Sequence, residues 1–144
     1  MKPKTKARIT AIRPADETSQ VLEVTGGGAG HRKQPCGGCP WRTDQDGMFP
    51  AEAFRISAPT AYDMSDRTFA CHESGSKKPA TCAGFLLKNA DNNMAVRLSM
   101  INGEDFRDVH DGGHELHDSY RSMAEANGVG PDDPTLARCR ANRK

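Results

Sequence analysis

Four cysteines, through their type and spacing, are the residues of this chain best suited to chemistry. Cys36 and Cys39 are separated by two glycines in the stretch 35–42 (PCGGCPWR), and Cys71 and Cys82 follow downstream in the pattern C-x2-C-x31-C-x10-C. Two thiolates at this spacing can reach one metal ion from a tight turn, and glycine allows the positive φ angles that such a turn can need. The four residues together predict a closed four-thiolate site that ties residue 36 to residue 82.

The identity of the metal stays open at the level of sequence. Zinc takes four cysteines, or three cysteines and a histidine, so His72 is an alternative to Cys71 or a neighbour of the site. A [4Fe-4S] cluster is the rival, because it also takes four cysteines and because Pro40 directly follows Cys39. Redox-active thiols without metal are a third interpretation.

Trp41 and Arg42 follow the first cysteine pair directly and have two interpretations. A tryptophan beside a metal loop can cover it as an internal lid. Alternatively, Trp41 stacks on a base or on a partner's side chain while Arg42 binds a phosphate. The second interpretation makes these two residues the candidate partner-binding site.

Three histidines and one further cysteine complete the set of reactive side chains. His110, His114 and His117 form His-x3-His-x2-His among acidic neighbours, a pattern that can hold a second, catalytic metal or be solvated loop histidines. Gly112 and Gly113 interrupt any helix across them. Cys139 is expected to be a small, half-buried apolar residue.

Composition and charge set the frame for this site. Hydrophobic residues make up 35% of the 144 residues and the mean hydropathy is −0.73, which predicts a small hydrophobic core. A bound metal ion is one of the usual ways in which such a small core is stabilised. Net charge is +1, with 8 basic and 3 acidic residues in 1–42 and 12 basic and 16 acidic in the rest. The N-terminal part of the chain is therefore a basic arm, which can contact phosphate groups or be a solvated tail. We find no signal peptide or membrane span, which favours the reducing cytoplasm.

The elements that must position the cysteines are short. Residues 7–13 and 21–25 predict two strands of a hairpin, and a glycine-rich linker follows at 26–30. Helices are predicted over 50–56, over 82–88, from Asp91 or Asn92 to Ile101, over 116–127, and from Asp133-Pro134 onward. Met94, Leu98 and Ile101 share one face of the third helix, as a core-facing stripe would.

The predicted fold is therefore a small, irregular, metal-stabilised α+β fold. An N-terminal β-hairpin precedes a metal-centred domain with three to four short helices. We divide the chain into a basic arm, hairpin and linker at 1–30, a four-cysteine metal-binding domain at 31–129, and a short helix or tail at 130–144.

The cysteine motifs also resemble a known family. PCGGCPWR, then FACHES, then CAGF, with MAVRL and SYRSMAEANGV further on, are similar to a family of uncharacterised small proteins from bacteriophages, prophages and actinobacteria. The resemblance covers about residues 34–129. It implies that Cys36, Cys39, Cys71 and Cys82 act together and that the source is a phage or prophage. It implies no activity.

The sequence contains no nucleophile elbow, no phosphate-binding loop and no interpretable carboxylate pair, so enzyme activity has little support. The leading interpretation is a zinc-stabilised binding module that acts on a host protein or nucleic acid in the host cytoplasm. An iron–sulfur or metal-dependent enzyme acting on nucleic acid, and a redox or metal sensor, are the alternatives.

Overall fold

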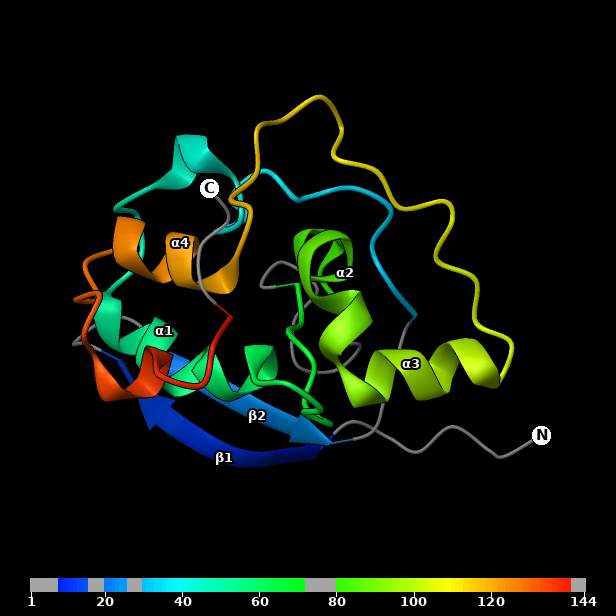
Figure 1. Ribbon diagram of the computed structural model, residues 1–144, viewed down its shortest axis with the longest axis horizontal. Helices are drawn as coiled ribbons and strands as arrows, with labels where there is room; N and C mark the ends of the chain where they lie inside the picture. The colour runs from blue at the N-terminus through cyan, green and yellow to red at the C-terminus, as the bar shows by residue number, and fades with distance from the viewer. Residues whose placement is uncertain (1–7, 16–19, 26–29, 72–79, 141–144) are drawn as a thin grey trace.

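The computed structural model describes residues 8–15, 20–25, 30–71 and 80–140, and it is mostly helical (Figure 1). The strands and helices are β1 (Arg8–Pro14), β2 (Gln20–Thr25), α1 (Ala51–Ser57), α2 (Ala83–Asn89), α3 (Met94–Ile101) and α4 (Tyr120–Ala126). Single 3-10 turns lie at Thr43–Gln45, Ala58–Ala61, Ala90–Asn92 and Pro134–Leu136. Four short helices within the described residues agree with the three to four predicted. None of these helices has the length and apolar character that crossing a membrane requires.

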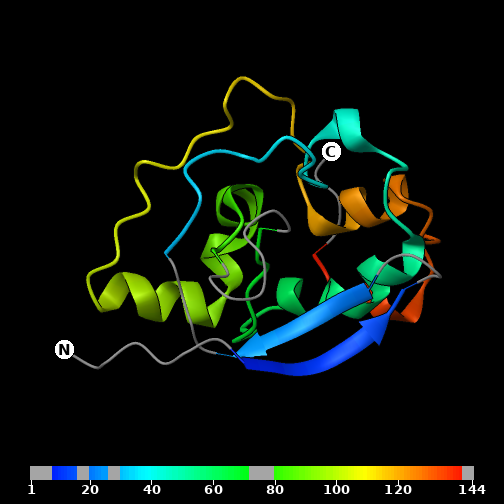
Figure 2. The ribbon, with the colours of Figure 1, turned by 180° about the vertical axis from the view of Figure 1, so that it is seen from behind.

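β1 and β2 form an antiparallel hairpin outside the region of the cysteines. The register runs from Arg8 opposite Thr25 to Pro14 opposite Gln20, and it shifts between Ile9 and Ala11. The strands begin and end within one residue of the predicted ranges. Seen from both sides, the hairpin lies along α1 (Figures 1 and 2). Residues 1–7 of the predicted basic arm and most of the linker at 26–30 lie outside the described residues.

Two helix starts differ from the predicted ones because of side-chain capping. Asn93, rather than Asp91 or Asn92, caps α3, since its side-chain oxygen accepts a hydrogen bond from the Val96 N–H at 3.0 Å. α4 begins at Tyr120 rather than near residue 116, and Ser119 caps it by accepting the N–H of Ser122 at 3.0 Å. The apolar Leu116, which suggested the earlier start, lies in an isolated antiparallel bridge with Arg42.

The apolar stripe predicted for α3 is largely on the surface. Leu98 is 49% exposed and Ile101 is 78% exposed, whereas Val96 is buried. The helix is therefore held by Val96 and by its cap rather than by that stripe. The Asn93 amide strengthens the cap, because it also donates to the carbonyl oxygens of Thr60 and Arg67.

The core is built around Trp41, whose ring is fully buried. Edge-to-face contacts join it to Phe69 and Tyr120, with ring centroids about 6 Å apart. Leu136 and Cys139 are also buried in this cluster. The predicted last helix is only the 3-10 turn Pro134–Leu136, and Cys139, predicted to be half-buried, is 6% exposed. The segment after residue 130 therefore contributes directly to the core.

Candidate metal centre

The first cysteine pair sits in a tight hydrogen-bonded turn. The Cys39 N–H donates to the Cys36 carbonyl at 3.2 Å, and the Arg42 N–H donates to the Cys39 carbonyl at 3.0 Å. Cys39 is completely buried, while Cys36 is half-buried and packs against the core. This successive turn is the local geometry that the C-x2-C spacing predicts, and it presents both thiols to the same region.

The second pair is brought together by a short antiparallel pairing. Ala70 pairs with Thr81, the Cys71 N–H donates to the Ala80 carbonyl at 2.7 Å, and the Cys82 N–H donates to the Phe69 carbonyl at 2.8 Å. Side chains alternate between the two faces of such a pairing. Cys71 and Cys82 each lie one residue beyond the bridge and are buried, so their side chains leave from one face as diagonal neighbours.

The same segment joins the two cysteine pairs. Thr81 forms a parallel bridge with His31, in which the Arg32 N–H donates to the Thr81 carbonyl at 2.9 Å and the Thr81 N–H donates to the Gly30 carbonyl at 3.1 Å. The backbone leading to Cys36 is thereby fixed beside Cys82. Backbone hydrogen bonds thus join residues that are more than forty positions apart in the sequence.

One contact between the two pairs joins sulfur to sulfur. Cys39 Sγ and Cys82 Sγ are 3.7 Å apart, and none of the five cysteines forms a disulfide. A hydrogen bond from Cys36 lowers the pKa of the Cys39 thiol, but the hydrogen bond with Cys82 and burial outweigh it and raise the pKa to about 12. A cation among these sulfurs would reverse that shift, because a coordinating thiol is deprotonated.

Arg42 braces the turn from outside rather than facing a partner. Its Nη1 donates to the carbonyl oxygens of Cys36 at 3.3 Å and Gly37 at 3.1 Å. Its Nε donates to Asp44 Oδ1 at 2.9 Å, and the two side chains form an ion pair that raises the pKa of Arg42 and lowers that of Asp44. The guanidinium also acts as a positive charge on the thiols of Cys36 and Cys39.

Trp41 is a buried core residue, a position that does not fit the interpretation as a partner-binding ring. It is fully buried, so its indole offers no face to a base or to another protein. The backbone of α2 comes so close that a Cβ added at Gly84 would meet Trp41 Cβ at 2.6 Å. Gly84 lies in the CAGF motif directly after Cys82, and an isolated glycine in a predicted helix is the signal for such a close approach.

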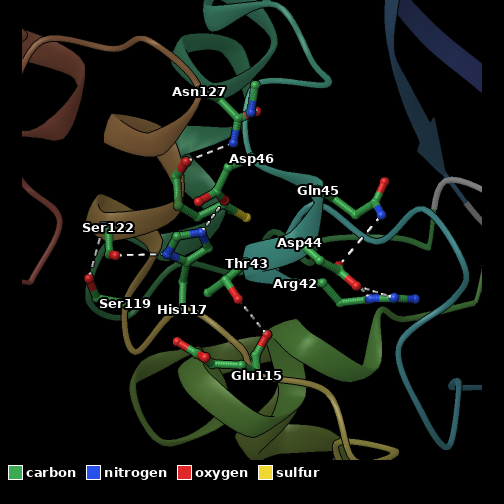
Figure 3. A network of polar contacts seen from close by, with 12 residues as sticks. Arg42, Thr43, Asp44, Gln45, Asp46, Glu115, His117, Ser119, Ser122 and Asn127 are labelled. Atoms are coloured by element: carbon green, nitrogen blue, oxygen red, sulfur yellow. Dashed lines mark hydrogen bonds and ion pairs between the residues drawn. The ribbon is translucent and has the colours of Figure 1, made fainter.

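The three histidines predicted as one possible metal site do not act together. His117 is buried. Its Nε2 is hydrogen-bonded to Asp46 Oδ1 at 2.6 Å and its Nδ1 to Ser122 Oγ at 2.8 Å (Figure 3). His110 and His114 instead line a shallow pocket of about 460 Å³ with Lys88, Asp111, Glu115 and apolar neighbours. His72, the alternative ligand, lies outside the described residues.

The described residues contain no group of side chains arranged as metal ligands. In the ranges 8–15, 20–25, 30–71 and 80–140, no group of three or more Cys, His, Asp or Glu side chains converges closely enough to hold an ion. The donor set nevertheless suits a soft-ligand metal, since two sulfurs are at ligand spacing and two more cysteines border them. The contact between Asp46, His117 and Ser122 had no signal in the sequence, because 71 residues separate the first two.

Comparison with known proteins gives a family and no named relative. No curated protein matches the chain, and no solved structure matches it. A family described as "Family of unknown function (DUF6283)" matches residues 31–140. The match begins where the predicted metal-binding domain begins and extends past residue 129 through the buried Leu136 and Cys139. The chain therefore belongs to DUF6283, a family of unknown function.

Proposed function

We propose that this chain is a small binding module whose fold is organised by one zinc ion bound through Cys36, Cys39, Cys71 and Cys82. The observation that carries the proposal is the distance of 3.7 Å between Cys39 Sγ and Cys82 Sγ. A tetrahedral ion with Zn–S bonds of about 2.3 Å places its sulfur ligands about 3.8 Å apart. A disulfide would need about 2.05 Å instead.

The same distance favours one metal ion over a [4Fe-4S] cluster. In such a cluster each cysteine binds a different iron, so the cysteine sulfurs stand further apart than two ligands of one ion. The sulfurs of Cys39 and Cys82 already have the shorter spacing, and both residues are buried. Zinc is also the metal that a closed, structural four-thiolate site most commonly holds.

Metal content and a cobalt spectrum test the site. The chain purified without added chelator should contain one zinc per molecule, and exchange for cobalt should give the intense thiolate charge-transfer absorption and tetrahedral bands of a four-sulfur site. Cys82→Ser should lose the metal. Cys139→Ser is the matched control, because Cys139 is equally buried but lies near the Ala58 carbonyl, away from the other thiols. Iron and sulfide in the purified protein would overturn the zinc assignment.

For the partner we propose a protein rather than a nucleic acid. Residues 31–140 carry 13 basic and 16 acidic residues, an excess of negative charge that opposes binding to a phosphate backbone. Arg42 is engaged with Asp44, and Trp41 is buried. The exposed apolar residues Leu98, Met100 and Ile101 of α3 provide instead the kind of surface that protein partners cover.

Binding to labelled single- and double-stranded DNA at low salt tests this choice. The chain should show only weak affinity, and neutralising Lys2, Lys4 and Lys6 to glutamine should abolish it. Tight, salt-dependent binding that survives this change would contradict a protein partner. A phage or prophage origin and a place of action in the host cytoplasm remain part of the proposal. They rest on the cysteine-motif resemblance and on cysteines that form no disulfide.

A further inference from the structure

Asp46, His117 and Ser122 form a continuous hydrogen-bonded chain, and we infer that it is a Ser-His-Asp triad able to catalyse acyl transfer to Ser122. His117 Nε2 lies 2.6 Å from Asp46 Oδ1, and His117 Nδ1 lies 2.8 Å from Ser122 Oγ (Figure 3). A nucleophile bonded to a base that a third group orients is the geometric signature of an activated serine. This inference is independent of the proposed zinc site and partner.

The hydrogen bonds fix the tautomer that a general base requires. An ionised Asp46 only accepts, so the proton of a neutral His117 stands on Nε2 and faces the carboxylate. Nδ1 is then left with a lone pair that accepts the hydroxyl proton of Ser122. The familiar serine triads use the two ring nitrogens in the opposite order; here Nδ1 takes the role of the base and Nε2 faces the carboxylate.

Backbone hydrogen bonds on three elements hold the triad in position. The His117 N–H donates to the Trp41 carbonyl at 2.9 Å, and the Thr43 N–H donates to the Glu115 carbonyl at 3.0 Å, which pairs the segments that carry the base and the acid. Ser122 stands in the first turn of α4, where its N–H is bound by Ser119 Oγ. Such support from fixed backbone is what a preorganised site needs.

The three side chains of the triad differ in their exposure to solvent. The His117 side chain is 8% exposed, which shields the base from water, whereas the Asp46 side chain is 41% exposed. Ser122 is half-buried, between the two.

The chemistry that these groups support is hydrolysis of a small carboxylic ester. Ser122 Oγ attacks the carbonyl carbon while its proton passes to His117 Nδ1, and the tetrahedral adduct collapses when that proton passes to the departing alkoxide. This leaves an acyl ester on Ser122 and a free alcohol. Water then attacks the acyl ester, gives its proton to His117, and releases the acid as Ser122 Oγ recovers the proton.

A fluorophosphonate probe tests the inference on the full chain as purified, since it reacts with activated serines and not with ordinary ones. Peptide mass spectrometry should locate the phosphonyl group on Ser122. His117→Gln should slow the labelling about a hundredfold or more, because a general base contributes about 10² to 10⁴ in rate. Ser122→Ala should abolish it while metal content stays the same.

Ser57 provides the matched control. Its hydroxyl is also part-buried and hydrogen-bonded, at 2.6 Å to the Tyr120 hydroxyl, but no histidine contacts it in the described structure. Ser57→Ala should leave labelling of Ser122 unchanged. Absence of any adduct on Ser122 in the folded chain, or labelling of Ser57 at the same rate, would overturn the triad and leave His117 as a structural link.

Discussion

The side chain of Arg42, which the sequence suggests could bind a partner, instead makes hydrogen bonds within the protein. Its position after PCGGCPW suggests a grip on phosphate, but its guanidinium donates to two carbonyls of the cysteine turn and to Asp44. Because Arg42 binds the carbonyl oxygens of Cys36 and Gly37, these carbonyls point away from the cysteine sulfurs. The backbone N–H groups of the turn then remain oriented toward the sulfurs. Its positive charge also lies close to two thiols whose ionised forms a metal requires. We therefore expect Arg42 to act on metal affinity.

Substituting Arg42 tests this role at the proposed zinc site. Arg42→Gln should weaken zinc binding about 10- to 100-fold, the cost typical of losing a residue that orients metal ligands. A competition titration with a chromophoric chelator measures the affinity. Arg107→Gln is the matched control: Arg107 pairs with Asp105 two residues away through a similar ion pair, but its side chain is 91% exposed. Equal effects of the two substitutions would contradict a specific role for Arg42.

At the scale of elements, the position of α2 depends on a single missing side chain. α2 begins directly after Cys82, and Gly84 in its first turn lies against the buried ring of Trp41. The φ angle of Gly84 is not among the positive ones, so the glycine is required by space and not by backbone conformation. Any side chain here would push α2, and with it Cys82, away from the first cysteine pair.

We expect Gly84→Ala to destabilise the fold by about 1–3 kcal/mol, the usual cost of overpacking a core. The added Cβ would stand 2.6 Å and 2.7 Å from two Trp41 atoms, and this clash outweighs the gain of about 1 kcal/mol in helix propensity. Urea unfolding measures the difference. At Gly130, where nothing lies within 4 Å, alanine should be neutral or slightly stabilising. A stabilised Gly84→Ala protein would show that α2 can shift freely.

The elements that could be predicted are those with local signals. Pro50 marks the start of α1, Gly128 marks the end of α4, and β-forming residues such as Ile9, Ile12 and Val21 mark the hairpin. The start of α4 could not be predicted, because the apolar Leu116 continues the helical spacing but pairs with Arg42. Likewise the cysteine pairs could be recognised from their spacing in the sequence. The contacts of His117 with Asp46 and Ser122 could not, because they form only in the tertiary structure.

At the scale of the whole molecule, a thin core surrounds the cysteine turn. The buried cluster draws on α1, α2, α3, α4 and the segment after residue 130, and it includes Cys39, Cys82 and Trp41. No helix in the described part of the chain exceeds eight residues. Helices this short are not stable alone and depend on tertiary packing. A metal that joins residues 36–39 to residues 71–82 would therefore support elements well beyond its own ligands.

Removal of the metal should unfold the chain, because structural zinc contributes about 10–16 kcal/mol of apparent binding free energy and folding draws on it. Trp41, the single tryptophan, is fully buried and reports the change directly. On addition of a strong chelator, its fluorescence should shift to the red and the cooperative thermal transition should disappear, and zinc should restore both, whereas magnesium should not. A chelated chain that keeps its blue emission and its cooperative transition would show that the apolar core folds without metal, leaving the cysteines as a site formed after folding.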